Sequence, residues 1–231
     1  MSYWKTLKLH GKITLRFAND IVKGDLFRFT KKTNQNIPFD YAIHLKQEIK
    51  VNATFESKLH NFSLANQEIN QHIVRPKEIF SFWHVIGKPT NRFKKGRTIQ
   101  NGKIVEENGG GLCQVSGIIC HVSLLVGLKI IERHNHSVDI YTEETRFCPL
   151  GTDATLVYGY KDLRIKNDYS FPIKFELKVI DNFIFVSVLS PIKIEEKSLN
   201  FEAEQRNDYK YVTVTNQAGT VVNISKYKNK L

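Results

Sequence analysis

The residue best placed to do chemistry is Cys113, which follows three consecutive glycines and opens a strongly apolar segment. Residues 113–126 are apolar on nearly all sides, which predicts a buried helix ended by Gly127. A thiol at the start of a helix lies where free backbone N–H groups and the helix dipole stabilise a thiolate. Gly110 and Gly111 leave room for a substrate beside the sulfur. The pattern therefore predicts a nucleophilic cysteine.

Two histidines follow at a distance that suits this cysteine. A helix of about 15 residues spans roughly 22 Å, and a strand of about seven residues returning from Leu128 covers nearly the same length. The chain should come back level with Cys113 near His134 and His136, which an extended segment would place on one face. We favour His136 as the base, because a strand pattern begins beside it, and Asp153 as the group that orients its ring.

Other roles stay open for these residues. Gln114 either donates its amide to an oxyanion or is an ordinary first-turn residue, and His134 remains a second candidate base. Cys113 is alternatively a small packing residue, or a zinc ligand together with His134, His136 and Cys148. Because these spacings match no closed structural zinc pattern, we expect neither a metal nor a cofactor.

Periodicity indicates an α+β fold with a buried central helix on a mainly antiparallel sheet. Strict alternation predicts a strand over residues 49–56, and helical spacing predicts an amphipathic helix over 62–73 that stops before Pro76. Further strands are expected over residues 128–133, 138–142, 154–160, 173–179 and 183–189, with a small hairpin near 212–222. We divide the chain into a basic N-terminal extension (1–48), a core domain (49–192) and a polar C-terminal appendage (193–231).

Composition fits an ordinary soluble globular protein, with 41% apolar residues and a net charge of +11. The charge favours anionic partners and is concentrated in residues 75–103, where four basic residues either bind an anionic group or form a solvated face. These residues are Arg92, Lys94, Lys95 and Arg97. No nucleic-acid-binding motif accompanies them, so we expect no nucleic acid partner.

The cellular compartment follows from the cysteines and from the hydropathy. Three cysteines suit a reducing compartment better than a disulfide scaffold. We find no pattern of a signal peptide or a membrane span, so a cytoplasmic protein is expected, with a membrane surface as one possible peripheral partner. The sequence does not indicate an oligomeric state.

Four stretches together resemble the VanW family. They are Phe80–Trp83, Asn108–Ser116, Glu132–Ser137 and Gly151–Thr155, within a resemblance that covers roughly residues 49–189. The family accompanies glycopeptide-resistance genes or occurs in cell-envelope proteins, which implies a cell-wall context.

The order of Cys113, His136 and Asp153 is also similar, more weakly, to that of transglutaminase-like cysteine enzymes, which implies a papain- or transglutaminase-like fold. The resulting hypothesis is a cysteine-dependent amide hydrolase or transferase that acts on an anionic cell-wall precursor or peptide. The alternative is a non-catalytic module that binds a peptidoglycan precursor or a glycopeptide.

Overall fold

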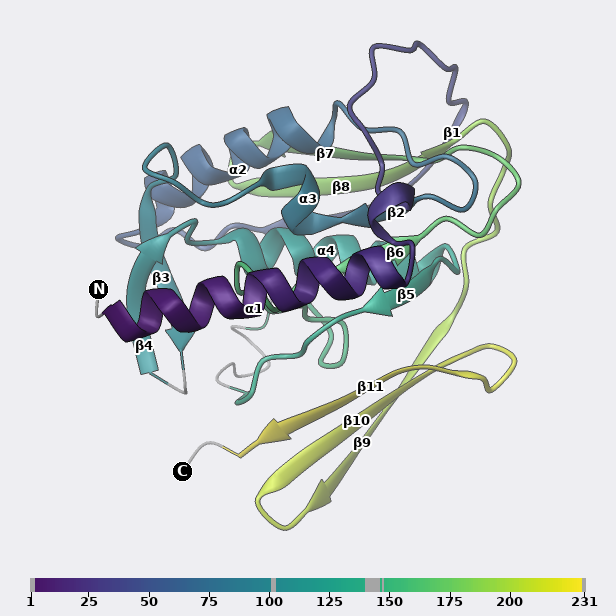
Figure 1. The fold of residues 1–231 in the computed structure, drawn as a ribbon. Coiled ribbons are helices and arrows are strands. Elements are labelled where there is room, and N and C mark those ends of the chain that lie inside the picture. The colour runs from purple at the N-terminus through teal and green to yellow at the C-terminus, as the bar shows by residue number, and fades with distance from the viewer. Residues whose placement is uncertain (1–2, 101–102, 140–145, 147, 230–231) are drawn as a thin grey trace.

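The computed structural model describes residues 3–100, 103–139, 146 and 148–229, and its architecture is α+β (Figure 1). The helical elements are α1 (Tyr3–Val22), the short η1 (Leu26–Arg28), α2 (Phe55–Ile69), α3 (Phe82–Ile86) and α4 (Leu112–Leu125). The strands are β1 (Tyr41–Glu48), β2 (Ile79–Ser81), β3 (Lys95–Gln100), β4 (Lys103–Asn108), β5 (Lys129–Glu132), β6 (Arg164–Lys166), β7 (Lys174–Ile180), β8 (Phe183–Ser190), β9 (Leu199–Arg206), β10 (Tyr209–Asn216) and β11 (Val221–Lys228).

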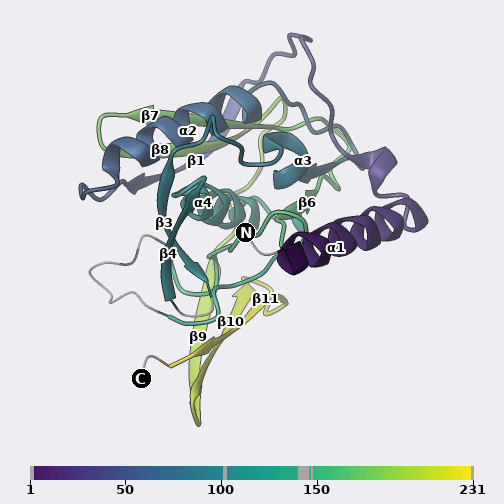
Figure 2. The same cartoon turned by 60° about the vertical axis from the view of Figure 1, so that its left-hand side comes forward.

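The strands form several small antiparallel sheets. Within the described residues, the strand orders are β1-β8-β7, β2-β6-β5, β3-β4 and β11-β10-β9. Helix α4 packs against β1, β8, β5 and α2, while α2 covers β7 (Figures 1 and 2). The central helix is therefore confirmed, but it lies among small sheets rather than on a single one.

The buried helix α4 follows from its sequence. Residues along its whole circumference are buried, including Val115, Ile118, Ile119 and Val122. After the helix, Gly127 takes a φ of 68°, a value that glycine adopts without strain, and the chain turns into β5. Because α4 is enclosed, its first turn is fixed relative to the surrounding loops.

Two predicted strands are wrong. The strand of this region is β1, and residues 52–54 form a turn in which the Asn52 side chain accepts the Thr54 N–H (3.0 Å) at the entrance to α2. The alternation over 49–56 therefore did not mark a strand, and α2 begins at Phe55 rather than near residue 62. Residues 154–160 are irregular as well, because side chains and loops satisfy their backbone: the Ser116 hydroxyl donates to the Ala154 carbonyl (2.6 Å).

Other predicted strands have counterparts. β5, β7 and β8 match the predictions, and Asp181 takes a positive φ of 54° in the turn between β7 and β8. The predicted small hairpin corresponds to β10 and β11, which are longer than expected. In the region predicted as strand 138–142, Val138 forms an isolated bridge to Lys228, and residues 140–142 lie outside the described residues.

Both ends of the chain contact the core. β1 lies N-terminal to the expected boundary at residue 48 but pairs with β8 over its full length. The three C-terminal strands form their own sheet, and their contacts with the loop around Asp153 are described below. Helix α1 crosses the front of the molecule in Figure 1, where the sequence had indicated no regular element. Among the described residues, no helix is both long and apolar enough to cross a membrane.

Candidate functional site

Cys113 lies in the first turn of α4, at one wall of an open cleft. The helix follows Gly111, whose φ is 92°, and a Cβ on Gly110 would lie only 2.3 Å from the Cα of Gly96. The glycines are thus required where the loop crosses β3 and turns into the helix. Cys113 is half-buried, and the cleft beside it has a volume of about 220 Å³. Its lining includes Leu9, Trp83, Glu107, Gly110, Leu156 and Tyr158.

The structure brings His136 and Asp153 to this cysteine. The Asp153 carboxylate lies 2.7 Å from Nδ1 of His136 and accepts the backbone N–H of the same residue at 2.8 Å. The imidazole in turn interacts with the Cys113 thiol, which also interacts with Thr155 and Leu156. Nucleophile, base and orienting carboxylate therefore occur in the order that a thiol–imidazole pair requires.

The electrostatics favour a thiolate–imidazolium pair. Burial opposes ionisation of Cys113, but the hydrogen bond and charge of His136 outweigh it, so the pKa of the thiol is lowered. Burial would also lower the pKa of His136, whereas Asp153 and Cys113 raise it to about 10. Burial would raise the pKa of Asp153, but His136 and Arg133 lower it to about 2. Each group thus stabilises the charged form of its neighbour.

Asp153 has further partners that the sequence had not indicated. Arg133 donates to its side chain (3.1 Å) and to its carbonyl (2.7 Å), and the hydroxyl of Tyr227 on β11 donates to the carboxylate. We call Arg133, His136, Asp153 and Tyr227 the Asp153 cluster. Arg133 stood within one of the family-like stretches, but Tyr227 is 74 residues from Asp153 and no local pattern links the two.

The second histidine points to a different carboxylate. His134 Nε2 lies 3.0 Å from Glu132, not beside the thiol. Since β5 ends at Glu132, the alternation that would place both histidines on one face does not continue. The structure therefore places His136, and not His134, at Cys113.

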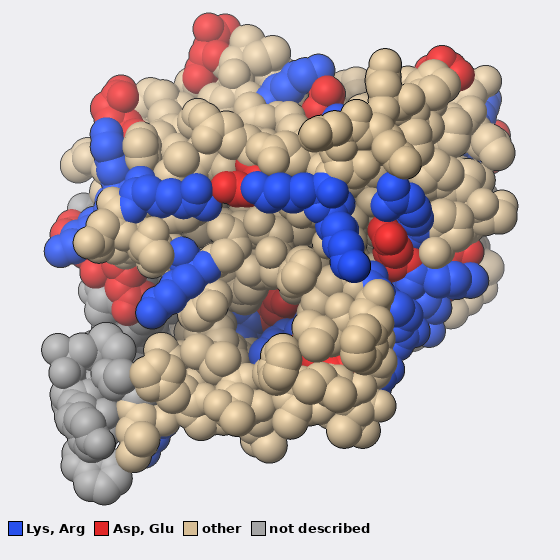
Figure 3. Space-filling model, turned by 45° about the horizontal axis from the view of Figure 1, so that its top comes forward, with Lys and Arg blue, Asp and Glu red and all other residues tan. Residues whose placement is uncertain are grey.

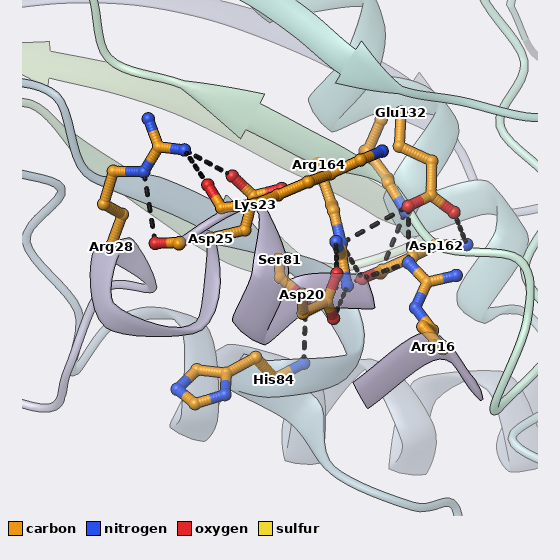
Figure 4. A network of polar contacts seen from close by, with 12 residues as sticks. Arg16, Asp20, Lys23, Asp25, Arg28, Ser81, His84, Glu132, Asp162 and Arg164 are labelled. Carbon is orange, nitrogen blue, oxygen red and sulfur yellow. Dashed lines mark hydrogen bonds and ion pairs between the residues drawn. The ribbon is translucent and has the colours of Figure 1, made fainter. Parts of the chain in front are cut away.

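Glu132 belongs to a network that holds α1 on the core (Figure 4). Arg164 donates twice to Asp20 of α1, at 2.6 Å each, and also contacts Glu132 and Asp162. Arg16 of α1 pairs with Glu132. Burial would raise the pKa of Glu132, but hydrogen bonds from His134 and Arg16 lower it to about 2. We call Arg16, Asp20, Glu132, His134, Asp162 and Arg164 the Glu132 cluster.

Other candidate residues have structural partners. The Gln114 amide is buried and donates to the Glu48 carbonyl (3.1 Å), so it is engaged away from a substrate oxyanion. Ser116 binds the Ala154 carbonyl. Gly110 lines the cleft, whereas a Cβ on Gly111 would meet the ring of Phe62.

Three of the four basic residues expected to bind an anion do not line this cleft. Arg92 pairs with Glu68 (2.9 Å), and the backbone of Lys94 binds the Asn61 side chain. Arg92, Lys94 and Lys95 are not among the described residues that line the cleft, and the side chain of Arg97 lies outside what the structure describes. Figure 3 shows basic side chains running across one face of the molecule, as a solvated basic surface would.

The remaining cysteines differ from Cys113. Cys120 and Cys148 are buried, and burial raises the pKa of their thiols to about 11 and about 12. Within residues 3–100, 103–139, 146 and 148–229, no three His, Cys, Asp or Glu side chains gather as metal ligands. The zinc site that the sequence left open has no such cluster to support it.

Both a family model and two known proteins are similar to this chain. A family model described as "VanW like protein" matches residues 57–189. The "Vancomycin B-type resistance protein VanW" of Enterococcus faecalis (strain ATCC 700802 / V583) is 31% identical over 167 residues, which cover 69% of this chain and 61% of that protein. The "Uncharacterized protein YoaR" of Bacillus subtilis (strain 168) is 34% identical over 141 residues, 60% of this chain and 45% of that protein.

In both relatives the match spans less than two thirds of the relative's length. No solved structure matches the chain, so the similarity to papain and transglutaminase-like enzymes gains no structural counterpart. The family model, by contrast, covers more than half of the chain and includes Cys113, His136 and Asp153. This chain therefore belongs to the VanW-like family.

Proposed function

We propose that the protein is a cysteine-dependent hydrolase or transferase that acts at an amide bond. The observation that carries this proposal is the contact chain from Asp153 through His136 to Cys113 at the wall of an open cleft. A lowered thiol pKa and a carboxylate that fixes the imidazole are what nucleophilic cysteine catalysis requires. A merely structural cysteine, such as Cys120, has a raised pKa instead.

The proposed reaction has two steps. Sγ of Cys113 attacks the amide carbonyl carbon and forms a C–S bond; His136 gives its proton to the leaving nitrogen as the C–N bond breaks. Water or an acceptor amine then attacks the thioester carbonyl and loses a proton to His136, and the thiolate leaves. Asp153 holds the imidazole in the required orientation throughout and stabilises its charged form.

The substrate class is proposed from the family. One relative is a vancomycin B-type resistance protein, and we infer that this chain acts in the same cell-wall context on a peptide or a peptide-bearing precursor. The cleft suits a short peptide, because Trp83 and Tyr158 in its lining offer apolar surface and Glu107 and the Gly110 backbone offer polar groups.

The pH dependence of Cys113 alkylation tests the proposal. Iodoacetamide labelling with peptide-resolved mass spectrometry follows each native cysteine separately. We expect Cys113 to react with an inflection well below the ordinary thiol value of about 8.5, and His136→Ala to raise it. His134→Ala is the matched control, because its imidazole contacts Glu132 instead.

A second measurement separates the enzyme from a binding module. Incubation with purified peptidoglycan peptides should add an acyl mass to wild type in intact-mass spectra, and Cys113→Ala should lose that adduct. If the alkylation inflection of Cys113 lay at the ordinary thiol value and did not change in His136→Ala, Cys113 would not be an activated nucleophile. Equal peptide affinity of wild type and Cys113→Ser without any adduct would establish the non-catalytic binding module instead.

A further inference from the structure

Helix α1 exposes most of its large apolar side chains to solvent. Leu15 is 73% exposed, Val22 is 85% exposed, and Leu7, Phe17 and Ile21 are also exposed. The side that faces the core contains Arg16 and Asp20, which enter the Glu132 cluster (Figure 4). A surface helix of a globular protein normally has the opposite arrangement.

The exposed apolar residues form one continuous stripe. At about 100° per residue, they occupy an arc of about 160° in the order Phe17, Ile21, Leu7, Val22, Leu15. The other described residues of this arc are His10, Gly11, Thr14 and Ala18, so over residues 7–22 the arc contains no Lys, Arg, Asp or Glu. The lower part of Figure 3 shows a broad area with few charged side chains.

Basic residues line one edge of the stripe, and further apolar surface continues it. Lys8 and Lys12 follow Leu15 around the helix, and Lys23 comes directly after its last turn. Phe27 in η1, beyond the C-terminal end of α1, is 77% exposed. On the opposite side of α1, Leu9 and Ile13 lie against Gly159 of the core.

We propose that α1 is a membrane-surface anchor that lies in the headgroup region of an anionic phospholipid bilayer. An apolar face flanked by lysines is the pattern of helices that lie parallel to such a surface. The apolar stripe would enter the acyl boundary, and Lys8 and Lys23 would meet the lipid phosphates, while Lys12 lies over the ring of Tyr160 (4.0 Å). Charge complementarity favours this occupant over a second copy of this basic chain, which carries +11.

Binding of α1 to a bilayer would also fix the position of the Cys113 cleft relative to the membrane surface. Leu9, on the opposite side of α1 from the stripe, lines the cleft that contains Cys113, so a bilayer under α1 would lie about one helix diameter, roughly 10–12 Å, from Leu9. The proposed lipid binding is inferred from the exposed residues of α1 and does not depend on the proposed chemistry at Cys113.

Vesicle co-sedimentation of the full chain tests this anchor. We expect binding to phosphatidylcholine vesicles that contain phosphatidylglycerol, weaker binding without it, and a decrease with salt. The double variant Leu15→Ser/Val22→Ser should reduce the partition coefficient by at least about tenfold. The matched control is Ile192→Ser/Ile224→Ser, which removes two comparably exposed apolar side chains outside α1 and should bind as wild type does.

The outcomes are distinct. Circular dichroism melts should be alike for wild type and the two double variants, because all four substituted side chains are exposed. Failure of wild type to bind the anionic vesicles, or equal binding by the α1 variant, overturns the proposal. Self-association in analytical ultracentrifugation that the α1 variant abolishes, without vesicle binding by wild type, overturns it in favour of a second copy on this face. A negative result here leaves the alkylation test of Cys113 unaffected.

Discussion

The Asp153 cluster and the Glu132 cluster each combine a carboxylate with arginine and histidine. Both contain residues of the segment 132–136. In the first, Asp153 contacts Arg133, His136 and Tyr227. In the second, Glu132 contacts Arg16, Arg164 and the other histidine. Both carboxylates have a pKa lowered to about 2 by their cationic partners despite burial.

The clusters differ in the group that each one contacts next. His136 contacts the thiol of Cys113 beside a cleft, whereas the Glu132 cluster leads to Asp20 and so to α1. The same chemistry therefore prepares a nucleophile in one place and attaches a helix in the other. Residue type alone does not assign a role to a buried carboxylate; the next group in the contact chain does. The following predictions test whether the two clusters act separately.

The largest effect is expected from Asp153→Asn. The side chains of Arg133 and Asp153 are only 4% and 9% exposed, so the substitution leaves a buried guanidinium without its anionic partner. Breaking such a pair costs about 3–5 kcal/mol of unfolding free energy. The alkylation inflection of Cys113 should also rise, because His136 loses the group that keeps it protonated. Urea unfolding and alkylation measure the two effects, and a stable variant with an unchanged inflection would contradict the prediction.

Acid should weaken both clusters. The pKa values of Asp153 and Glu132 are lowered from 3.8 and 4.5 to about 2. A lowered pKa stabilises the fold above the unfolded value, and this stability is lost as the pH falls towards 2. We expect Asp153 to account for about 2 kcal/mol and Glu132 for about 3 kcal/mol over this window.

Glu132→Gln separates the contributions of the two clusters to the loss of stability in acid. The slope of unfolding free energy against pH below 4.5 should fall by the Glu132 share, while the Asp153 share remains. Denaturant titrations across this range provide the slope, and an unchanged slope would contradict the assignment.

The residues Cys113, His136 and Asp153 are easier to predict from the sequence than Tyr227, which contacts Asp153 from β11. The glycines before Cys113, the apolar helix and the return distance to His136 are local features, and the structure brings these residues together with Asp153. The role of Tyr227 depends on the way a sheet 74 residues further along packs against the Asp153 loop, which no spacing rule describes.

The errors in the fold have similar causes. Alternation over residues 49–56 predicts a strand, but the side chain of Asn52 forms a turn there, and the strand is the preceding segment, β1. In residues 154–160, β-prone residues form no strand because Ser116 and other groups bind the backbone. No helix is predicted in residues 1–48, because their scattered apolar residues indicate no sustained period, although over residues 7–22 most of them lie along one side of α1.

Asp20→Asn should loosen α1 without affecting the thiol. The carboxylate accepts two hydrogen bonds from Arg164, which keeps Glu132 and Asp162 as partners in the variant. We expect a loss of about 1–2 kcal/mol and faster amide hydrogen exchange in α1. Asp25→Asn is the control, because its pair with the exposed Arg28 is worth less than about 1 kcal/mol. A shifted Cys113 inflection in Asp20→Asn would mean that the two clusters are coupled.

The smallest effect is expected from His134→Ala, and it bears most directly on the separation of the clusters. Glu132 keeps Arg16 and Arg164 when the half-exposed imidazole is removed, so the unfolding free energy should fall by less than about 1 kcal/mol. The alkylation profile of Cys113 should coincide with that of wild type, whereas His136→Ala shifts it upward. If His134→Ala raised the inflection as well, charge in the Glu132 cluster would be acting on the thiol across β5, and the nucleophile would depend on both clusters rather than on Asp153 alone.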